Sequence, residues 1–192
     1  MTDYKHYKLW KPYGYLSQFV NNQNRRKNKK LLGDLGDFDS SIMPIGRLDE
    51  KSEGLIFLTD NGKLSQLVRG GKIEKEYTVK VDGIIDKQAI ELLKKGVNIQ
   101  IHGKTYKTKP CKAMLMNDDP QLPTHQKPRA LKHGATSWYR IILTEGKFRQ
   151  VRKMSAAVGF PCLRLIRTRI GEETLDGLIP GGYERVDSFK LH

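Results

Sequence analysis

The chain has 192 residues, 38% of them hydrophobic, which is enough to bury one good core within the usual size range of a single domain. Lys and Arg number 35 against 21 Asp and Glu, so the formal charge at pH 7 is +14. This excess is larger than solubility needs and predicts a polyanionic partner. The apolar runs are too short to span a bilayer and no apolar signal core follows the first Met, which excludes a membrane span and predicts a soluble, cytoplasmic protein.

The cysteine and histidine pattern predicts neither a disulfide framework nor a metal site. Cys111 and Cys162 form no Cys-x-x-Cys pair, so both are expected to be reduced thiols. No two of the five His residues are four positions apart, and none is near a Cys. We therefore expect no metal and no cofactor.

The first third of the chain predicts two strands separated by a basic loop. Residues 7–10 are an apolar run that ends at a turn in 11–14. Residues 23–30 carry five positive charges and no apolar side chain, which is typical of a solvated loop. Residues 55–59 predict a buried strand, followed by a turn and a short helix with Leu64, Leu67 and Val68.

The middle of the chain predicts a strand, a helix and a hairpin. Residues 73–81 alternate with a period of two, with Tyr77 on the apolar side, as in a half-buried strand. Asp86 can cap a helix that ends before Gly96. Residues 97–101 and 105–109 flank a His-Gly turn and predict a hairpin.

The last third predicts an irregular loop, then strand, helix and strand. The loop covers residues 117–134, which contain three prolines. Residues 138–143 and 163–170 predict strands, and residues 147–158 predict a helix with an apolar stripe at Val151, Met154, Ala157 and Val158. Strands and helices mix without a βαβ repeat, so the pattern favours an α+β fold.

Positive charge is concentrated near the C-terminus. Between positions 140 and 169 there are eight basic residues and one acid, Glu145. Such a segment can neutralise many phosphates, so composition predicts a nucleic-acid binder.

Residues 44–59 (PIGRLDEKSEGLIFLT) resemble the signature of the RsuA-type pseudouridine synthases, with its Gly-Arg-Leu-Asp core, Ser-Glu-Gly and a final apolar run. Further segments resemble that family's motifs in the expected order. They are residues 8–17 (KLWKPYGYLS), 75–79 (KEYTV), 145–154 (EGKFRQVRKM) and 163–171 (LRLIRTRIG). The resemblance covers nearly the whole chain.

The resemblance implies the pseudouridine synthase catalytic fold: a mixed, largely antiparallel sheet with flanking helices and a central cleft. The chain has no room for the S4 domain of many relatives and looks most like the short RluE branch, which acts on large-subunit ribosomal RNA. We therefore expect residues 1–192 to form one two-lobed, monomeric domain with polar insertions at 21–40 and 117–134. Two positions depart from the family, since Phe148 replaces a frequent Asn and Lys153 a frequent Arg.

The family's site residues carry over by position. Asp49 matches the nucleophile, which attacks either the uracil ring or the ribose C1′ of a flipped-out uridine. Arg152 matches the arginine that pairs with this carboxylate, and Tyr77 the tyrosine that stacks on the base. Substrate contacts are expected from Leu165 on the opposite wall and from five basic residues, Arg47, Lys75, Lys147, Arg149 and Arg167.

Without the motif, each of these residues has a structural explanation. Asp49 would cap a helix, Tyr77 would be a core tyrosine and Arg152 would be a phosphate contact. Two other functions also stay open: a non-catalytic RNA-binding factor for ribosome assembly on the same scaffold, and a glycosidase that releases free uracil. The joint occurrence of the motifs favours a pseudouridine synthase.

Overall fold

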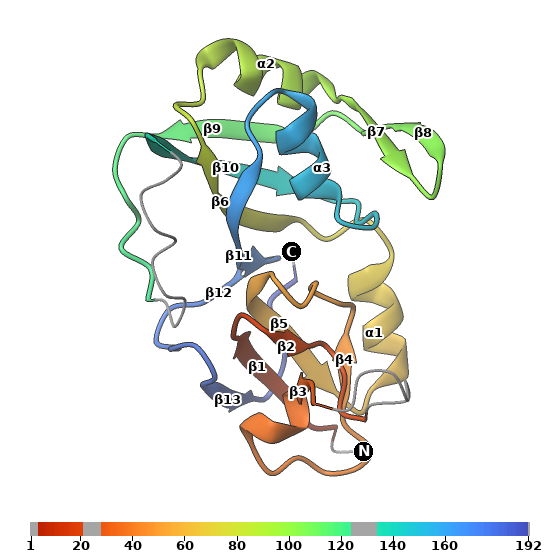
Figure 1. Ribbon diagram of the computed structural model, residues 1–192. Helices are drawn as coiled ribbons and strands as arrows, with labels where there is room; N and C mark the ends of the chain where they lie inside the picture. The colour runs from red at the N-terminus through yellow and green to blue at the C-terminus, as the bar shows by residue number, and fades with distance from the viewer. Residues whose placement is uncertain (1–3, 21–27, 124–133, 192) are drawn as a thin grey trace.

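The computed structural model describes residues 4–20, 28–123 and 134–191. Within them, nine strands form the main sheet shown in Figure 1. In spatial order they are β13 (Tyr183–Val186), β1 (His6–Lys11), β5 (Glu53–Thr59), β11 (Cys162–Ile170), β6 (Lys75–Asp82), β10 (Thr136–Leu143) and β9 (Lys112–Met116), with β12 (Glu173–Thr174) beside β11 and β4 (Met43–Ile45) beside β5. The α+β prediction is confirmed.

The pairing of these strands is mixed. β5 and β11 are parallel, with Ile166 opposite Glu53, and the other neighbours in the main sheet are antiparallel. The expected mixed, largely antiparallel sheet is therefore present. The parallel pair joins two halves of the molecule, and we name each half by its helices.

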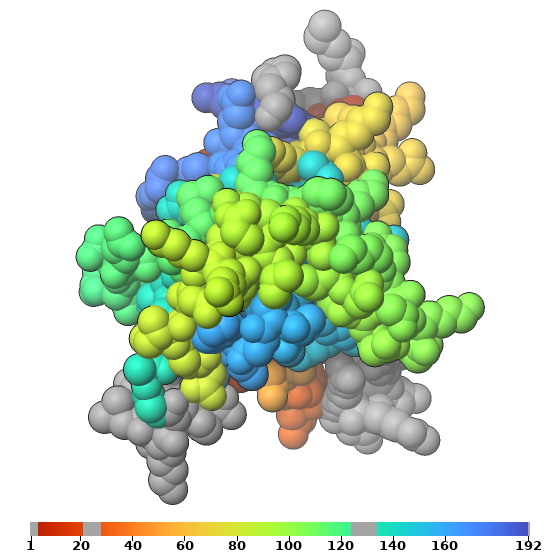
Figure 2. All heavy atoms as spheres, turned by 90° about the horizontal axis from the view of Figure 1, so that it is seen from above, coloured from red at the N-terminus to blue at the C-terminus, as the bar shows by residue number. Residues whose placement is uncertain are grey.

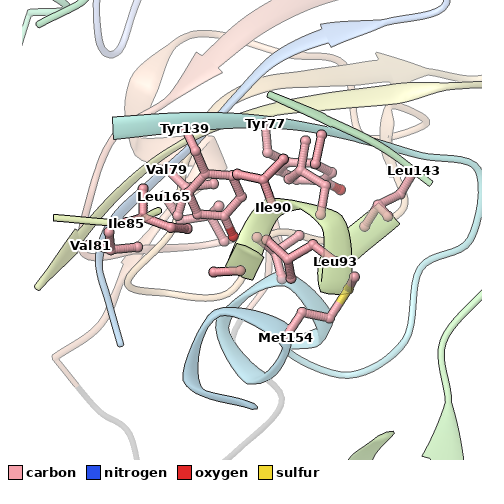
Figure 3. Packing of buried hydrophobic residues seen from close by; sticks show 14 of the residues in the cluster. Tyr77, Val79, Val81, Ile85, Ile90, Leu93, Tyr139, Leu143, Met154 and Leu165 are labelled. Atoms are coloured by element: carbon pink, nitrogen blue, oxygen red, sulfur yellow. The ribbon is translucent and has the colours of Figure 1, made fainter. Parts of the chain in front are cut away.

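The α2–α3 half consists of β6, β9, β10 and β11 covered by α2 (Lys87–Lys95) and α3 (Gln150–Ala157), with the hairpin β7 (Asn98–Ile101) and β8 (Lys104–Lys107) beside them. Leu93 from α2 and Met154 from α3 lie in one hydrophobic cluster with Tyr139 of the sheet, and all three are fully buried (Figure 3). Viewed from above, α2, the hairpin and α3 form one continuous outer face (Figure 2).

The capped helix that the sequence predicted is present in this half. The side chain of Asp86 accepts a hydrogen bond from the amide of Ala89 at 2.7 Å, and α2 ends at Gly96, whose φ is +83°. A Cβ at Gly96 would lie 2.2 Å from the carbonyl oxygen of Thr108, so both the backbone conformation and the close approach require glycine.

The α1 half contains β1, β4, β5 and β13 with α1 (Gly62–Arg69), the short pair β2 (Tyr15–Leu16) and β3 (Lys30–Leu31), and the 3-10 helix η1 (Leu32–Leu35). Leu32 is fully buried, and Leu35 and Phe38 pack against the same cluster. Within the expected polar insertion at 21–40, the apolar side chains of residues 32, 35 and 38 thus pack against β1 and β5. Residues 21–27 lie outside the described part.

Two further details differ from the sequence predictions. Leu67 is 53% exposed, because Ser65 and Val68 form the buried face of α1. In the predicted loop at 117–134, residues 124–133 lie outside the described part, but Leu122 packs against a buried cluster to which both halves contribute.

The Ser-Glu-Gly motif ties the two halves together at the start of β5. Glu53 is 4% exposed in its side chain and pairs with Arg164 of β11 at 2.8 Å. A Cβ at Gly54, whose φ is +108°, would lie 2.3 Å from the carbonyl oxygen of Arg167. Only glycine permits this close parallel approach.

Helix α3 begins at Gln150 rather than at position 147, where the sequence predicted it. Arg149 adopts a left-handed backbone, with φ 53° and ψ 34°, so residues 147–149 form a turn that leads into the helix. On the helix itself, Ser155 is buried and Ala157 is exposed, because the Ser155 hydroxyl hydrogen-bonds to that of Tyr139 at 2.7 Å.

Candidate active site

A cavity of about 660 Å³ lies between the two halves and corresponds to the expected cleft. Its walls come from the segment after β4, from β6 and β11, and from the residues between β10 and α3. Eight of the nine predicted site residues line it: Arg47, Asp49, Lys75, Tyr77, Lys147, Arg149, Leu165 and Arg167. Arg152 does not.

Asp49 lies in a loop whose backbone is held by hydrogen bonds to residues 14–17 of the N-terminal segment. The hydroxyl of Ser17 accepts a hydrogen bond from the amide of Leu48 at 2.9 Å and donates to the carbonyl of the same residue at 2.8 Å. The amide of Gly14 donates to the carbonyl of Glu50 at 2.8 Å. The chain after Asp49 turns into β5, so the alternative that Asp49 caps a helix is excluded.

Lys11, in the segment at 8–17, connects this segment to the loop that contains Asp49. Its side chain is fully buried, and Nζ donates to the carbonyls of Pro12 at 2.9 Å, Tyr15 at 2.7 Å and Glu50 at 3.5 Å. Burial lowers the pKa of Lys11 to about 7, although the nearby carboxylates of Glu53, Asp49 and Glu50 oppose this shift. A buried amino group therefore joins β1, β2 and the Asp49 loop.

Arg149 lies beside Asp49. One of its terminal nitrogens, Nη1, is 3.7 Å from Oδ2 of the carboxylate, and the side chains are 39% and 27% exposed. A left-handed backbone costs a non-glycine residue about 1–3 kcal/mol and occurs often at functional sites. The conformation places Arg149 before the first turn of α3, at the wall of the cavity.

Arg152 does not pair with Asp49, and this corrects the sequence assignment. Its Nη2 donates to the carbonyl of Lys51 at 2.5 Å, and Nε and Nη2 reach the hydroxyl of Ser52. Nη1 reaches the carbonyl of Cys162 at 3.4 Å. Arg152 points from α3 to the segment that follows Asp49 and connects it to β11, so it positions the loop from outside the cavity.

Gln150 and Glu145 hold the turn that contains Arg149. Neither residue was assigned to the site from the sequence. The amide nitrogen of the Gln150 side chain donates to Glu145 at 2.6 Å, and its oxygen accepts from the Lys147 amide at 2.9 Å. Glu145 also accepts from the amide of Lys109 and the hydroxyl of Tyr106. Glu145 is the single acid in a basic segment, and that contrast is the sequence signal from which its role in holding this turn could have been predicted.

Tyr77 and Leu165 lie on the adjacent antiparallel strands β6 and β11 and line the same cavity. They are 9% and 5% exposed. Among the described residues, the Tyr77 hydroxyl has no hydrogen-bond partner. The pair adds largely apolar surface to the cavity that Asp49 also lines.

Two of the predicted basic contacts, half-buried Lys75 and buried Arg167, line the cavity. Burial and the neighbouring Arg167 lower the pKa of Lys75 to about 8, and its Nζ donates to the carbonyl of Ile73 at 3.1 Å. Arg167 is 4% exposed and donates to the carbonyl of Leu55 at 2.7 Å, while its Nη2 has no hydrogen-bond partner among the described residues. Arg47 and Lys147 are exposed at the rim.

The basic segment at 140–169 is only partly available for phosphates, which corrects the composition argument. Three of its arginines pair with glutamates of the protein itself: Arg140 with Glu76, Arg164 with Glu53, and Arg169 with Glu74 and Glu76. The cations of this segment that line the cavity and are exposed are Lys147 and Arg149.

Two features are absent from the described residues. No three His, Cys, Asp or Glu side chains are grouped there so that they could hold a metal ion. No helix in this part of the chain is long and apolar enough to cross a membrane.

Comparison with known proteins gives consistent matches. A family model described as RNA pseudouridylate synthase matches residues 6–157. The chain is 38% identical over 175 residues to the ribosomal large subunit pseudouridine synthase E of Xanthomonas axonopodis pv. citri, which covers 90% of this chain and 88% of that protein. Identity to the protein of the same name from Vibrio parahaemolyticus is 38% over 181 residues, or 92% of this chain and 71% of the relative.

A solved structure described as "Crystal structure of pseudouridylate synthase" superposes with a TM-score of 0.77 and 24% identity. The match covers 97% of this chain and 71% of the other. At this identity the likeness shows the fold alone.

Proposed function

The chain belongs to the RNA pseudouridylate synthase family, and on this premise we propose that it isomerises uridine to pseudouridine in large-subunit ribosomal RNA with Asp49 as its catalytic carboxylate. We propose in addition that it works as a monomeric, two-lobed single domain in the cytoplasm. The curated relatives named ribosomal large subunit pseudouridine synthase E support the choice of RNA.

The observation that carries the proposal is the placement of Asp49 beside Arg149 in a cavity walled by Tyr77 and Leu165. Its volume of about 660 Å³ lies inside the range of roughly 300–1,000 Å³ that small-ligand sites occupy. A uridine that is turned out of its stack therefore has room to enter. A stacked base cannot meet a carboxylate held this way.

The isomerisation breaks the C1′–N1 bond and forms a C1′–C5 bond, while the proton on C5 is released and N1 is left bearing one. Asp49 attacks either the uracil ring or C1′, and both routes need an ionised carboxylate. Arg149 provides a cation beside this carboxylate and helps to hold its orientation. Tyr77 and Leu165 enclose the base between apolar surfaces, and we infer that the Tyr77 phenol takes part in proton removal.

Exposed cations at the rim, Arg47 and Lys147, are suited to the phosphates on either side of the flipped nucleotide. The alternative of a non-catalytic RNA-binding factor on this scaffold needs the basic rim but not the loop contacts that fix Asp49. Those contacts, from Ser17, Lys11 and Gly14, favour the enzyme.

The test is to incubate the protein with unmodified large-subunit ribosomal RNA and map pseudouridine at single-nucleotide level. Asp49→Asn should abolish product while RNA affinity stays within a few-fold, because the amide keeps the shape and loses the nucleophile. Glu50→Gln is the matched control, since it makes the same chemical change one residue away, where the side chain pairs with Lys29 at 2.6 Å. Turnover by Asp49→Asn, or equal loss in Glu50→Gln, would refute the role of Asp49.

A further inference from the structure

An aromatic pair stands at the rim of the cavity. Phe148 lines the cavity and is 54% exposed. The His102 ring, from the turn of the β7–β8 hairpin, stacks on it with centroids 5.5 Å apart and planes inclined by 23°. The two residues come from separate elements, yet they form one exposed aromatic surface beside the opening.

Lysines accompany these aromatic rings. Lys153 Nζ lies 4.9 Å from the centroid of the Phe148 ring, and Lys147 Nζ lies 5.1 Å from that of Tyr106 in β8. Interleaved aromatic and cationic side chains provide stacking surfaces for bases and positive charge for the phosphates that connect them. No carboxylate forms an ion pair with Lys147 or Lys153 in the described part of the chain.

The backbone that carries Phe148 is held firmly. Gln150 accepts from the amide of Lys147 and donates through its own amide to the Lys147 carbonyl at 3.1 Å, so the turn is closed on itself. The next residue, Arg149, reaches Asp49. A ring held in this way loses little conformational entropy when it stacks on a ligand, which raises the affinity available from one contact.

We propose that the His102–Phe148 pair is a stacking platform for an unpaired base next to the flipped uridine in the same RNA strand. The proposal rests on the proposed function. Continuity with the cavity and the positive charge around the pair favour an RNA base over an apolar segment of protein.

One test uses a fluorescent reporter that does not depend on turnover. In Phe148→Trp the new indole replaces an exposed ring, whereas the native Trp10 and Trp138 are 2% and 7% exposed. A short single-stranded RNA with a central uridine should quench the new indole at saturation. An abasic strand of the same length should bind through its phosphates without quenching. Equal quenching by both strands, or none by the RNA, would overturn the platform.

A second test uses the RNA fragment that contains the mapped uridine. Stacking contributes about 1–3 kcal/mol per base, so Phe148→Asn should raise KM roughly 5- to 150-fold while kcat stays nearly constant. Phe148→Tyr should restore KM, and an abasic nucleotide at the stacked position should weaken the wild type but not Phe148→Asn. The control Leu67→Asn changes an equally exposed side chain on α1, outside the cavity lining, and should have no effect.

The outcomes of these tests separate the two proposals. If no uridine of the ribosomal RNA is modified, the proposed function fails and the quenching experiment still decides the platform. If uridine is modified with unchanged KM in Phe148→Asn, the platform fails and the proposed function stands.

Discussion

Arg152 donates to the hydroxyl of Ser52 from Nε at 3.4 Å and from Nη2 at 3.3 Å, and so connects α3 to the segment that follows Asp49. Arg149, three positions earlier, lies beside Asp49 instead. The two arginines therefore act on the same loop in different ways. Arg149 faces the carboxylate, and Arg152 holds the residues that follow it.

We expect Arg149→Met to lower the single-turnover rate constant by roughly 100-fold, because removal of one group that stabilises charge at a reacting centre has effects of about this size. Arg152→Met should lower the rate less. It should lower the free energy of unfolding by about 1–3 kcal/mol, since hydrogen bonds from a charged group are lost. Single-turnover assays and urea unfolding of both variants measure this contrast.

Arg149→Lys and Arg152→Lys serve as charge-preserving controls for this pair. A lysine at 149 keeps a cation near Asp49 and should recover part of the rate, whereas a lysine at 152 cannot reproduce three separate contacts. A larger rate loss in Arg152→Met than in Arg149→Met would contradict the assignment and restore the pairing expected from the motif.

The sequence predicted which segments meet at the site but not which arginine reaches Asp49. Asp49 and Arg149 are far apart along the chain, and the choice depends on the left-handed backbone of Arg149. Positive φ at a non-glycine residue leaves no mark in the sequence. Helix α2 was predictable because its cap, Asp86, and its last residue, before Gly96, are local features.

Gly54→Ala tests the close contact between β5 and β11. The added Cβ would meet the backbone of Arg167 at 2.3 Å, and the φ of +108° is unfavourable for alanine. We expect a loss of about 4 kcal/mol or more, or failure to fold. Gly62→Ala is the matched control, because Gly62 opens α1 and a Cβ added there would meet nothing within 4 Å, so it should stabilise by roughly 0.5–1 kcal/mol. Urea unfolding that shows equal effects would argue against the contact.

Lys11 gives a prediction for the pH dependence of stability. Its pKa of about 7 in the folded protein is below the ordinary value of 10.5, so between these pH values the unfolded chain binds more protons than the folded one. The contribution of Lys11 to the free energy of unfolding therefore rises as the pH increases from about 7 towards 10.5. The rise is at most about 1.4 kcal/mol per pH unit. The contribution stays at its lowest value below pH 7.

The measurement is the difference in unfolding free energy between the wild type and Lys11→Met across this range. Lys75, whose pKa is also lowered, is present in both proteins and cancels. Lys11→Met should be relatively more stable at low pH and lose that advantage as the pH rises. A difference that does not change with pH would show that burial does not lower the pKa of Lys11.

The interior pairing of the C-terminal arginines could not be predicted from charge counts. For Arg164 and Arg169 the partners, Glu53, Glu74 and Glu76, are 93 to 111 positions earlier, and they meet only because β11 lies between β5 and β6. Composition shows that the protein is basic. Only the order of the strands shows which arginines pair with glutamates of the protein itself and which cations line the cavity.

This separation gives a prediction about salt. Lys147→Gln should weaken RNA binding and flatten the slope of log affinity against log salt by about 0.7, the value for one phosphate on a single strand, because Lys147 is exposed at the cavity rim. Arg169→Gln removes the same charge but takes it from an internal contact with Glu74 and Glu76, so it should lower stability and leave the slope unchanged. Titrations of labelled RNA at several salt concentrations give both slopes. If the two variants flatten the slope equally, net charge alone governs RNA binding, and the distinction between rim and interior cations is wrong.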